Sequence, residues 1–188
     1  MKTLNVGIMK NPNMGNTKEA VGFFPFWAAD NGCFSEKWDA QKWLRFLIEW
    51  SSVENCLFAV VPDVVGDASA TRLLWTEWAP AVKALGYRAY YVLQDGEDGS
   101  TIPSDADGLF IGGSTEYKLS QVVEVICGRT ALPVHMGRVN TKKRILHAVR
   151  IGCSSSDGTL LAFGADANIG PLERFVAHAQ ALSTTHPL

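Results

Sequence analysis

Eight short apolar runs recur along the chain, and most of them are apolar at every position rather than at alternate positions. Such continuous runs are typical of parallel strands that are buried on both faces of a sheet. The runs cover residues 4–9, 23–28, 56–62, 88–93, 108–113, 132–137, 150–155 and 159–163. We therefore predict strands at these eight places, each ending in polar residues or glycine.

Segments with the period of amphipathic helices lie between several of these runs. The clearest begins after Asp39, a capping residue, and its apolar positions follow the helical spacing from Trp43 to Trp50. The expected helices cover residues 39–50, 67–86, 114–128, 140–152 and 170–182. Pro80 is expected to kink the second helix, and Pro171 falls in the first turn expected for the last.

The alternation of strands and helices predicts an α/β fold with a parallel sheet. Eight strand candidates favour a compact, irregular (β/α)8 barrel of the TIM type, with residues 1–188 as a single domain. Because such barrels usually take about 250 residues, helices must be short or missing, most clearly at 10–22, 95–107 and 156–158. An open, doubly wound sheet is the alternative.

The composition is that of a globular protein, with 47% hydrophobic and 19% charged residues. The formal net charge of −2 gives no general attraction to nucleic acid, so such binding must come from a local basic patch. No stretch approaches the roughly 20 apolar residues of a membrane span, and the first residues lack the pattern of a signal peptide. We therefore expect a cytoplasmic protein with no membrane partner.

In a parallel barrel the catalytic residues lie at the carboxyl ends of the strands, so the residues after each run are candidates. They are Asp30, Asp63, Gln94, Gly112, Gly113, His135, Arg138, Asn140 and Asp157. Any one alone also fits a turn or a helix cap, and Asp67 and Asp95 are assigned to those roles. Several carboxylates together suit divalent metal binding or chemistry at a glycosidic carbon. With Gln and backbone N–H groups beside them, they also suit the edge of a heterocycle.

Other kinds of site find no support in the sequence. There is no GxGxxG after the first run, no GxxxxGK[ST] and no GxSxG, so nucleotide-cofactor and serine-nucleophile sites are not expected. The four cysteines form no CxxC pair and have no histidine at ligand spacing, and only His135 lies on the predicted rim. We therefore expect no zinc site, no His-based metal site and no cofactor.

Six segments, within residues 24–170, together resemble the tRNA-guanine transglycosylases. They are more similar to the shorter relatives of these enzymes, the phage and bacterial 7-deazaguanine DNA transglycosylases. The segments are DNGCF, VVPDVVGDA, VLQDG, FIGGSTEYK, HMGRVNTKKRI and IGCSSSDGT. The resemblance implies an irregular (β/α)8 barrel that exchanges guanine for a 7-deazaguanine base of the preQ0 type.

The resemblance also implies roles for individual residues. Asp157 occupies the place of the nucleophile that attacks C1′ of the sugar, and Asp30 that of the acid/base. Asp63 would bind the N1 and 2-amino edge of the purine. Gln94 and the Gly112–Gly113 backbone would contact the carbonyl of the base.

The chain departs from the tRNA enzymes in lacking their zinc motif of three cysteines and a histidine, and it is far shorter. We therefore expect a barrel without the zinc subdomain, acting on guanine in DNA, or on a free nucleotide, with a free 7-deazaguanine base. A homodimer or an accessory protein is left open, as is a phage origin with activity in the bacterial host cytoplasm. Arg138, Lys142, Lys143 and Arg144 are the candidate phosphate-binding residues, although they also fit a solvated helix end.

Other functions fit the same residues. A DNA glycosylase would excise a base, modified or not, if water entered in place of the second base. A nucleoside or nucleotide deoxyribosyltransferase or hydrolase would act on small molecules. A silent module that binds a modified base would not need a nucleophile, and a metal-dependent hydrolase would be sensitive to chelators.

Overall fold

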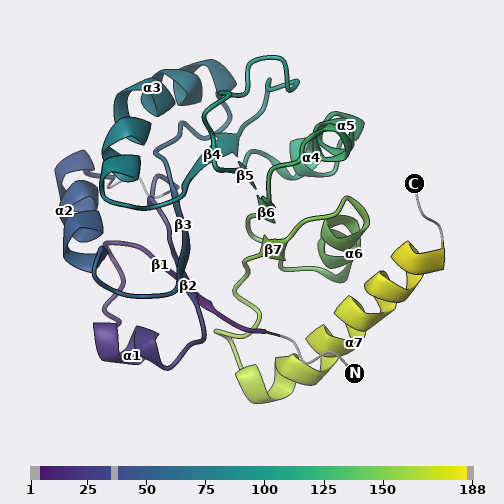
Figure 1. Cartoon of the computed structure of the whole chain (residues 1–188). Helices are drawn as coiled ribbons and strands as arrows, with labels where there is room; N and C mark the ends of the chain where they lie inside the picture. The colour runs from purple at the N-terminus through teal and green to yellow at the C-terminus, as the bar shows by residue number, and fades with distance from the viewer. Residues whose placement is uncertain (1–4, 35–37, 186–188) are drawn as a thin grey trace.

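The computed structural model describes residues 5–34 and 38–185, and its centre is a parallel sheet of seven strands. The strands are β1 Ile8–Lys10, β2 Trp27–Ala29, β3 Cys56–Val60, β4 Ala89–Leu93, β5 Gly108–Ile111, β6 Val134–Met136 and β7 Ser155–Ser156. Each strand pairs with the next one along the chain. The sheet curls, and helices lie around its outer side (Figure 1). The prediction of a parallel α/β fold of the TIM type is confirmed.

Three details of the fold prediction differ from the structure. The strand predicted at 150–155 is short and lies later, at Ser155–Ser156, because Arg150 still belongs to a helix and a turn follows it. The strand predicted at 159–163 is wrong, because these residues form turns between Gly158 and Gly164. A run of only five apolar residues does not distinguish a strand from a turn by its periodicity. The sheet is a curled half-barrel, and within the described residues no pairing joins β7 to β1. The sequential strand order also excludes the doubly wound alternative, whose order reverses at a switch point.

The helices are α1 Lys18–Gly22, α2 Ala40–Trp50, α3 Ala68–Ala84, α4 Thr115–Lys118, α5 Gln121–Arg129, α6 Lys142–Arg150 and α7 Ala165–Thr185. Three of them, α2, α3 and α4, begin after the first residues of their predicted segments, Asp39, Asp67 and Ser114, which cap them. The carboxylates of Asp39 and Asp67 accept the N–H groups of Lys42 and Ala70, both at 2.9 Å. In the described part of the chain, no helix has the length and apolar character needed to cross a membrane.

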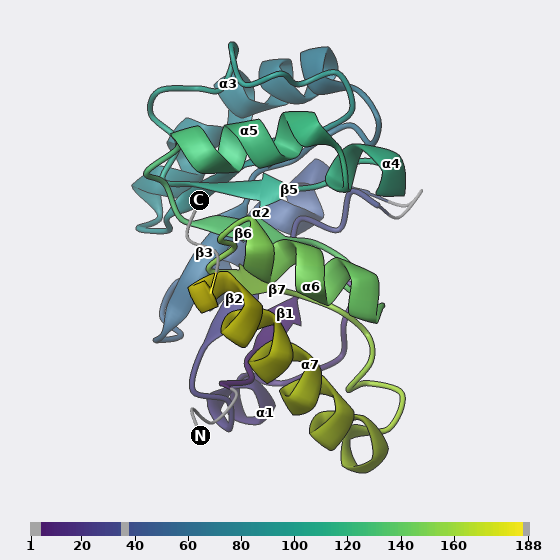
Figure 2. The same cartoon turned by 90° about the vertical axis from the view of Figure 1, so that its right-hand side faces the viewer.

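Two helices differ from their predicted bounds. Ser120 caps a new helix by accepting the N–H of Val123, so the segment predicted as one helix at 114–128 divides into α4 and α5. The last helix starts earlier than predicted, at Ala165, so Pro171 lies inside it rather than in its first turn. This helix, α7, packs against α6 (Figure 2).

The core has two apolar layers, one between the sheet and the helices and one inside the curl of the sheet. Trp27 and Ala29 in β2 belong to the outer layer, whereas Ala28 between them belongs to the inner one. This alternation is the geometry of a strand. In the inner layer, Phe58 and Tyr90 stack with 4.1 Å between their ring centroids. The inner layer fills the curl, and the loops at the carboxyl ends of the strands lie above it.

Candidate active site

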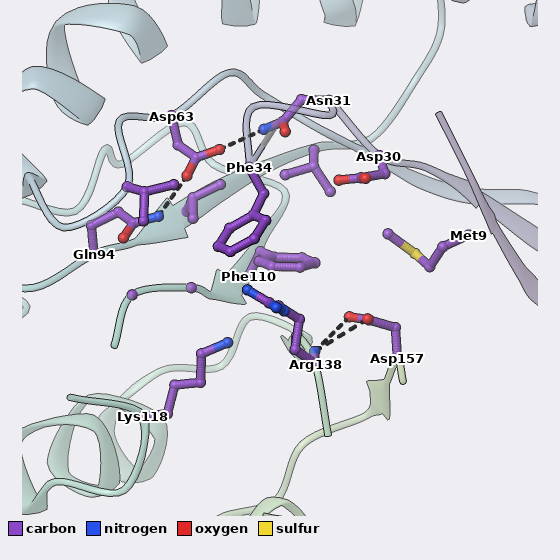
Figure 3. Close-up of a pocket in the computed structure, with 15 residues that line it drawn as sticks. Met9, Asp30, Asn31, Phe34, Asp63, Gln94, Phe110, Lys118, Arg138 and Asp157 are labelled. Atoms are coloured by element: carbon purple, nitrogen blue, oxygen red, sulfur yellow. Dashed lines mark hydrogen bonds between the residues drawn. The ribbon is translucent and has the colours of Figure 1, made fainter. Parts of the chain in front are cut away.

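A cavity of about 140 Å³ lies at the carboxyl ends of the strands, where parallel barrels carry their catalytic residues. Its floor is apolar and includes Met9, Val60, Val92 and Phe110. Its polar lining consists of Asp30, Asn31, Asp63, Gln94, Lys118, Arg138 and Asp157, with Gly112 and Gly113 (Figure 3). The six residues predicted for catalysis and base binding therefore line one cavity, although they come from distant parts of the chain.

Asp63 is held by two amide side chains. Asn31 donates to Asp63 Oδ1 at 2.7 Å, and Gln94 Nε2 donates to Asp63 Oδ2 at 2.5 Å. Burial raises the pKa of Asp63 to about 6, against the lowering effect of these hydrogen bonds. Gln94 is fixed in turn, because its Oε1 accepts the N–H of Gly66 at 2.9 Å. An amide nitrogen carries two hydrogens, so one N–H of Gln94 is left for a ligand.

Asp30 and Asp157 lie on the same side of the cavity (Figure 3). The N–H of Asp30 donates to Lys10 O at 2.8 Å, and Asn11 Nδ2 lies 3.4 Å from Asp30 Oδ2. Burial is the main cause that raises the pKa of Asp30, and the charge of Asp157 adds to it. The raised pKa makes it easier for Asp30 than for an ordinary aspartate to hold a proton.

The carboxylate of Asp157 is oriented by a backbone group and a histidine. The N–H of Arg138 donates to both of its oxygens, each at 3.1 Å. His135 Nε2 lies 3.1 Å from Asp157 Oδ1, and His135 Nδ1 lies 2.8 Å from Ser155 Oγ. In the tautomer with its hydrogen on Nε2, His135 donates to Asp157 and its Nδ1 accepts the hydroxyl hydrogen of Ser155. His135 thus links Asp157 to the interior of the curled sheet.

The two glycines after β5 have different roles. The N–H of Gly112 donates to Leu93 O at 2.9 Å as part of the sheet, so it is not available to a ligand. The contact predicted for this backbone therefore falls to Gly113, whose N–H has no partner among the described residues. Gly113 has a φ of 75°, and a Cβ atom there would lie 2.5 Å from Asp95 Oδ2.

Lys118 lines the cavity, and the sequence did not single it out. Its side chain is buried, and its Nζ donates to Gly137 O at 2.8 Å. Burial lowers the pKa of Lys118 to about 8, while the charges of Asp157 and Asp63 oppose this change. The one sequence feature that bears on the position of Lys118 is Ser120. Ser120 caps α5, so the preceding helix, α4, ends at Lys118.

The predicted phosphate-binding patch is divided among different settings. Arg138 borders the cavity, with its guanidinium 3.8 Å from the ring centroid of Phe34. Arg144 is bound to the protein, because it donates to Arg138 O at 2.8 Å and to a threonine of α4. Lys142 lies over a phenylalanine of α7, and Lys143 is exposed. Of the four predicted residues, Arg138 alone belongs to the lining of the cavity and of the groove beside it.

A second, more open groove of about 430 Å³ adjoins the cavity. It shares Phe34, Val65, Gly113 and Arg138 with the cavity and adds Gly66, Asp95, Ser114 and Thr115. The carboxylate of Asp95 accepts the N–H and the hydroxyl of Ser114, so it links the loop after β4 to the loop after β5 rather than capping a helix. Phe34 and Arg138 thus form a wall that the cavity and the groove have in common.

Within residues 5–34 and 38–185, no three His, Cys, Asp or Glu side chains lie close enough together to hold a metal ion. The rim carboxylates are instead hydrogen-bonded to amides, to a backbone N–H and to a histidine. Hydrogen bonds within the protein therefore account for the positions of these carboxylates.

Comparison with known proteins gives a likeness in fold. No family model and no curated protein matches the chain. The structure of 3-hexulose-6-phosphate synthase from Salmonella typhimurium aligns with a TM-score of 0.55 and 11% identity, over 87% of this chain and 78% of that one. A second 3-hexulose-6-phosphate synthase aligns with a TM-score of 0.53 and 11% identity, over 86% and 78%. Neither is a transglycosylase, and at this identity they establish that the chain has an α/β fold of the TIM-barrel type.

Proposed function

We propose that the protein is a base-exchange transglycosylase. It replaces guanine in DNA by a 7-deazaguanine base of the preQ0 type, through a covalent aspartyl-sugar intermediate. The observation that carries the proposal is the convergence of Asp30, Asp63 and Asp157, each held differently, on one small cavity. The similarity of six segments to the 7-deazaguanine DNA transglycosylases supports the same reaction.

The volume of the cavity is too small for a whole nucleotide. A cavity of about 150 Å³ holds benzene, which is smaller than a purine, and pockets for drug-sized ligands have about 300–1,000 Å³. The cavity has about 140 Å³ and can therefore take part of a base but not a whole nucleotide, so the sugar and phosphates stay at its mouth and in the adjoining groove. A nucleotide must leave its stack before its base can enter such a site.

The polar groups of the cavity complement one edge of guanine. The carboxylate of Asp63 accepts hydrogen bonds from the ring N–H and the exocyclic amino group. The remaining N–H of Gln94 and the N–H of Gly113 donate to the neighbouring carbonyl. A base without this pattern leaves buried polar groups unpaired, which lowers its affinity.

Asp157 and Asp30 divide the chemistry between them. As an oxygen of Asp157 bonds to C1′, the bond from C1′ to the base nitrogen breaks, and the base leaves with the electron pair and a proton from Asp30. The raised pKa of Asp30 favours the protonated form that this step needs. The incoming base returns a proton to Asp30, its nitrogen attacks C1′, and Asp157 leaves as a carboxylate. The hydrogen bonds from Arg138 and His135 stabilise this carboxylate.

Replacement of the nucleophile tests the proposal. The wild-type protein is incubated with guanine-containing DNA and a labelled 7-deazaguanine base, and it should incorporate the label and form a protein–DNA adduct that survives denaturation. The Asp157→Asn variant should do neither. Asp105→Asn, which changes a carboxylate before β5 at the opposite end of the sheet, should retain both. Base exchange by Asp157→Asn at the wild-type rate would exclude the assigned nucleophile.

Three changes to the reaction distinguish the proposal from its alternatives. With the free base omitted, sites that break in alkali would identify a glycosylase. Turnover of free deoxyguanosine nucleotides without a polymer would identify an enzyme of small molecules. Loss of activity with a chelator would identify a metal-dependent hydrolase.

A further inference from the structure

The turn after β6 contains an arginine in a left-handed backbone conformation. Arg138 has a φ of 61°, and among the described residues other than glycine only Asn55 also has a positive φ. Asparagine tolerates this conformation much better than arginine does. The side chain of Arg138 lies over Phe34 at the cavity, which a glycine at this position would not provide. A strained residue of this kind persists only where its surroundings hold it.

Two cations hold the carbonyl groups on either side of Arg138. Lys118 Nζ donates to Gly137 O, and Arg144 Nη1 donates to Arg138 O, both at 2.8 Å. Lys118 lies in α4 and Arg144 in α6, so two separate elements fix the turn. Lys118 is only 4% exposed, and water competes little with its hydrogen bond.

The peptide group between Gly137 and Arg138 connects Lys118 to Asp157. Its carbonyl accepts from Lys118, and its N–H donates to both oxygens of Asp157 at 3.1 Å. A donor on the carbonyl polarises the peptide and strengthens its N–H as a donor. We propose that Lys118 is a positioning residue, which holds the left-handed turn at Arg138 and so aims this N–H at Asp157. The catalytic consequence rests on the proposed function, whereas the structural one does not.

Lys118 faces charges from several elements. Burial lowers its pKa most, to about 8; Asp157 and Asp63 raise it, whereas Arg138 and Arg144 lower it. The side chain therefore loses its proton as the pH rises through about 8. A neutral amine donates a weaker hydrogen bond than an ammonium does. The hydrogen bond from Lys118 to Gly137 O, which holds the turn, is therefore weaker above this pH.

A double-mutant cycle tests the positioning role without requiring activity. The protection of the residue-138 amide against hydrogen exchange, measured by NMR, reports its bond to Asp157. Lys118→Met should lower this protection about tenfold or more, as expected for a hydrogen bond to a charged group. Glycine adopts the left-handed conformation without strain, so Lys118→Met with Arg138→Gly should regain the protection of Arg138→Gly alone. Lys10→Met removes another buried ammonium, in β1, and should leave this amide unchanged.

Unchanged protection in Lys118→Met would overturn the proposal. A double variant that stays unprotected would also overturn it, since Lys118 would then act by another route than the turn. In base-exchange assays, Lys118→Met should lower kcat more with arginine at 138 than in the Arg138→Gly background, with little change in KM. If none of the proteins, wild type included, exchanges bases, the proposed function fails, and the protection of the amide still decides the positioning role.

Discussion

Carboxylates at the two ends of the sheet are held in opposite ways. At the amino ends, Asp105 precedes β5, is 61% exposed and pairs with Lys83 at 2.9 Å. The hydrogen bond from Lys83 is the main cause that lowers the pKa of Asp105. At the carboxyl ends, Asp30 and Asp63 accept hydrogen bonds from amide side chains, and burial raises the pKa of both.

This difference separates a contribution to stability from a capacity for chemistry. A carboxylate paired with a cation favours the folded state, but its charge is already compensated. A buried carboxyl group without a bonded cation costs stability when it ionises, by about 1.4 kcal/mol for each pKa unit, and in return it can hold a proton or accept a ligand. Groups perturbed in this way gather at functional sites. The rim at the carboxyl ends therefore carries the candidate chemistry of the fold.

Replacement of Asp30 should give the largest contrast between the two ends. Asparagine has the shape of aspartate but supplies no proton, and loss of a general acid typically costs 10²- to 10⁴-fold in rate. We expect Asp30→Asn to lower kcat of base exchange by roughly this factor and Asp105→Asn to leave it unchanged. Steady-state assays at several pH values measure both. Nearly equal rates for the two variants would remove the distinction between the two ends.

The carboxylates of the rim were predictable because the strands of a parallel barrel end on one rim. A position directly after an apolar run was enough to assign Asp30, Asp63 and Asp157 to that rim. The run at 159–163 was misassigned for a related reason, since apolar character alone does not reveal whether a neighbouring strand is there to pair with it.

The positions of Lys118 and Arg144 were not predictable in the same way, although Arg138 was expected on the rim. The place of Lys118 depends on Ser120, which divides one periodic segment into two helices. The contact of Arg144 depends on the left-handed turn at Arg138, a conformation that nothing in the sequence indicates for an arginine. These features arise from the packing of loops against each other, which leaves no periodic pattern.

Asp63 should make base binding depend on pH, with an intermediate effect. Its pKa is about 6, and it must be ionised to accept hydrogen bonds from a base. We expect the Kd of guanine to fall as the pH rises towards 6, by about tenfold per pH unit, and to level off above it. Calorimetric titrations measure this trend, and the same titrations of Asp63→Asn should give a weak, flat response. A flat response in the wild type would separate Asp63 from base recognition.

Ionisation of Asp63 should lower the free energy of unfolding as the pH rises. Because its pKa in the folded protein is raised from 3.8 to about 6, the folded state prefers the protonated form. The stability of the wild type relative to Asp63→Asn should therefore be highest below about pH 4 and fall as the pH rises through about 6, by roughly 3 kcal/mol in all. Urea unfolding of both proteins across this range measures the difference.

Asp105 should give the smallest effect, with the opposite dependence on pH. Its pKa is lowered, so its contribution to stability is present above its ordinary pKa of 3.8 and is lost as the pH falls through its value in the folded protein. Because the carboxylate is mostly exposed, solvent screens its pair with Lys83, and the pair contributes at most about 1 kcal/mol. Urea unfolding of Asp105→Asn at neutral pH, with and without added salt, measures this contribution. If the free energy of unfolding of this variant fell by several kcal/mol, a carboxylate at the amino ends would matter to the fold as much as those of the rim are proposed to matter to catalysis. The division between the two ends would then not hold.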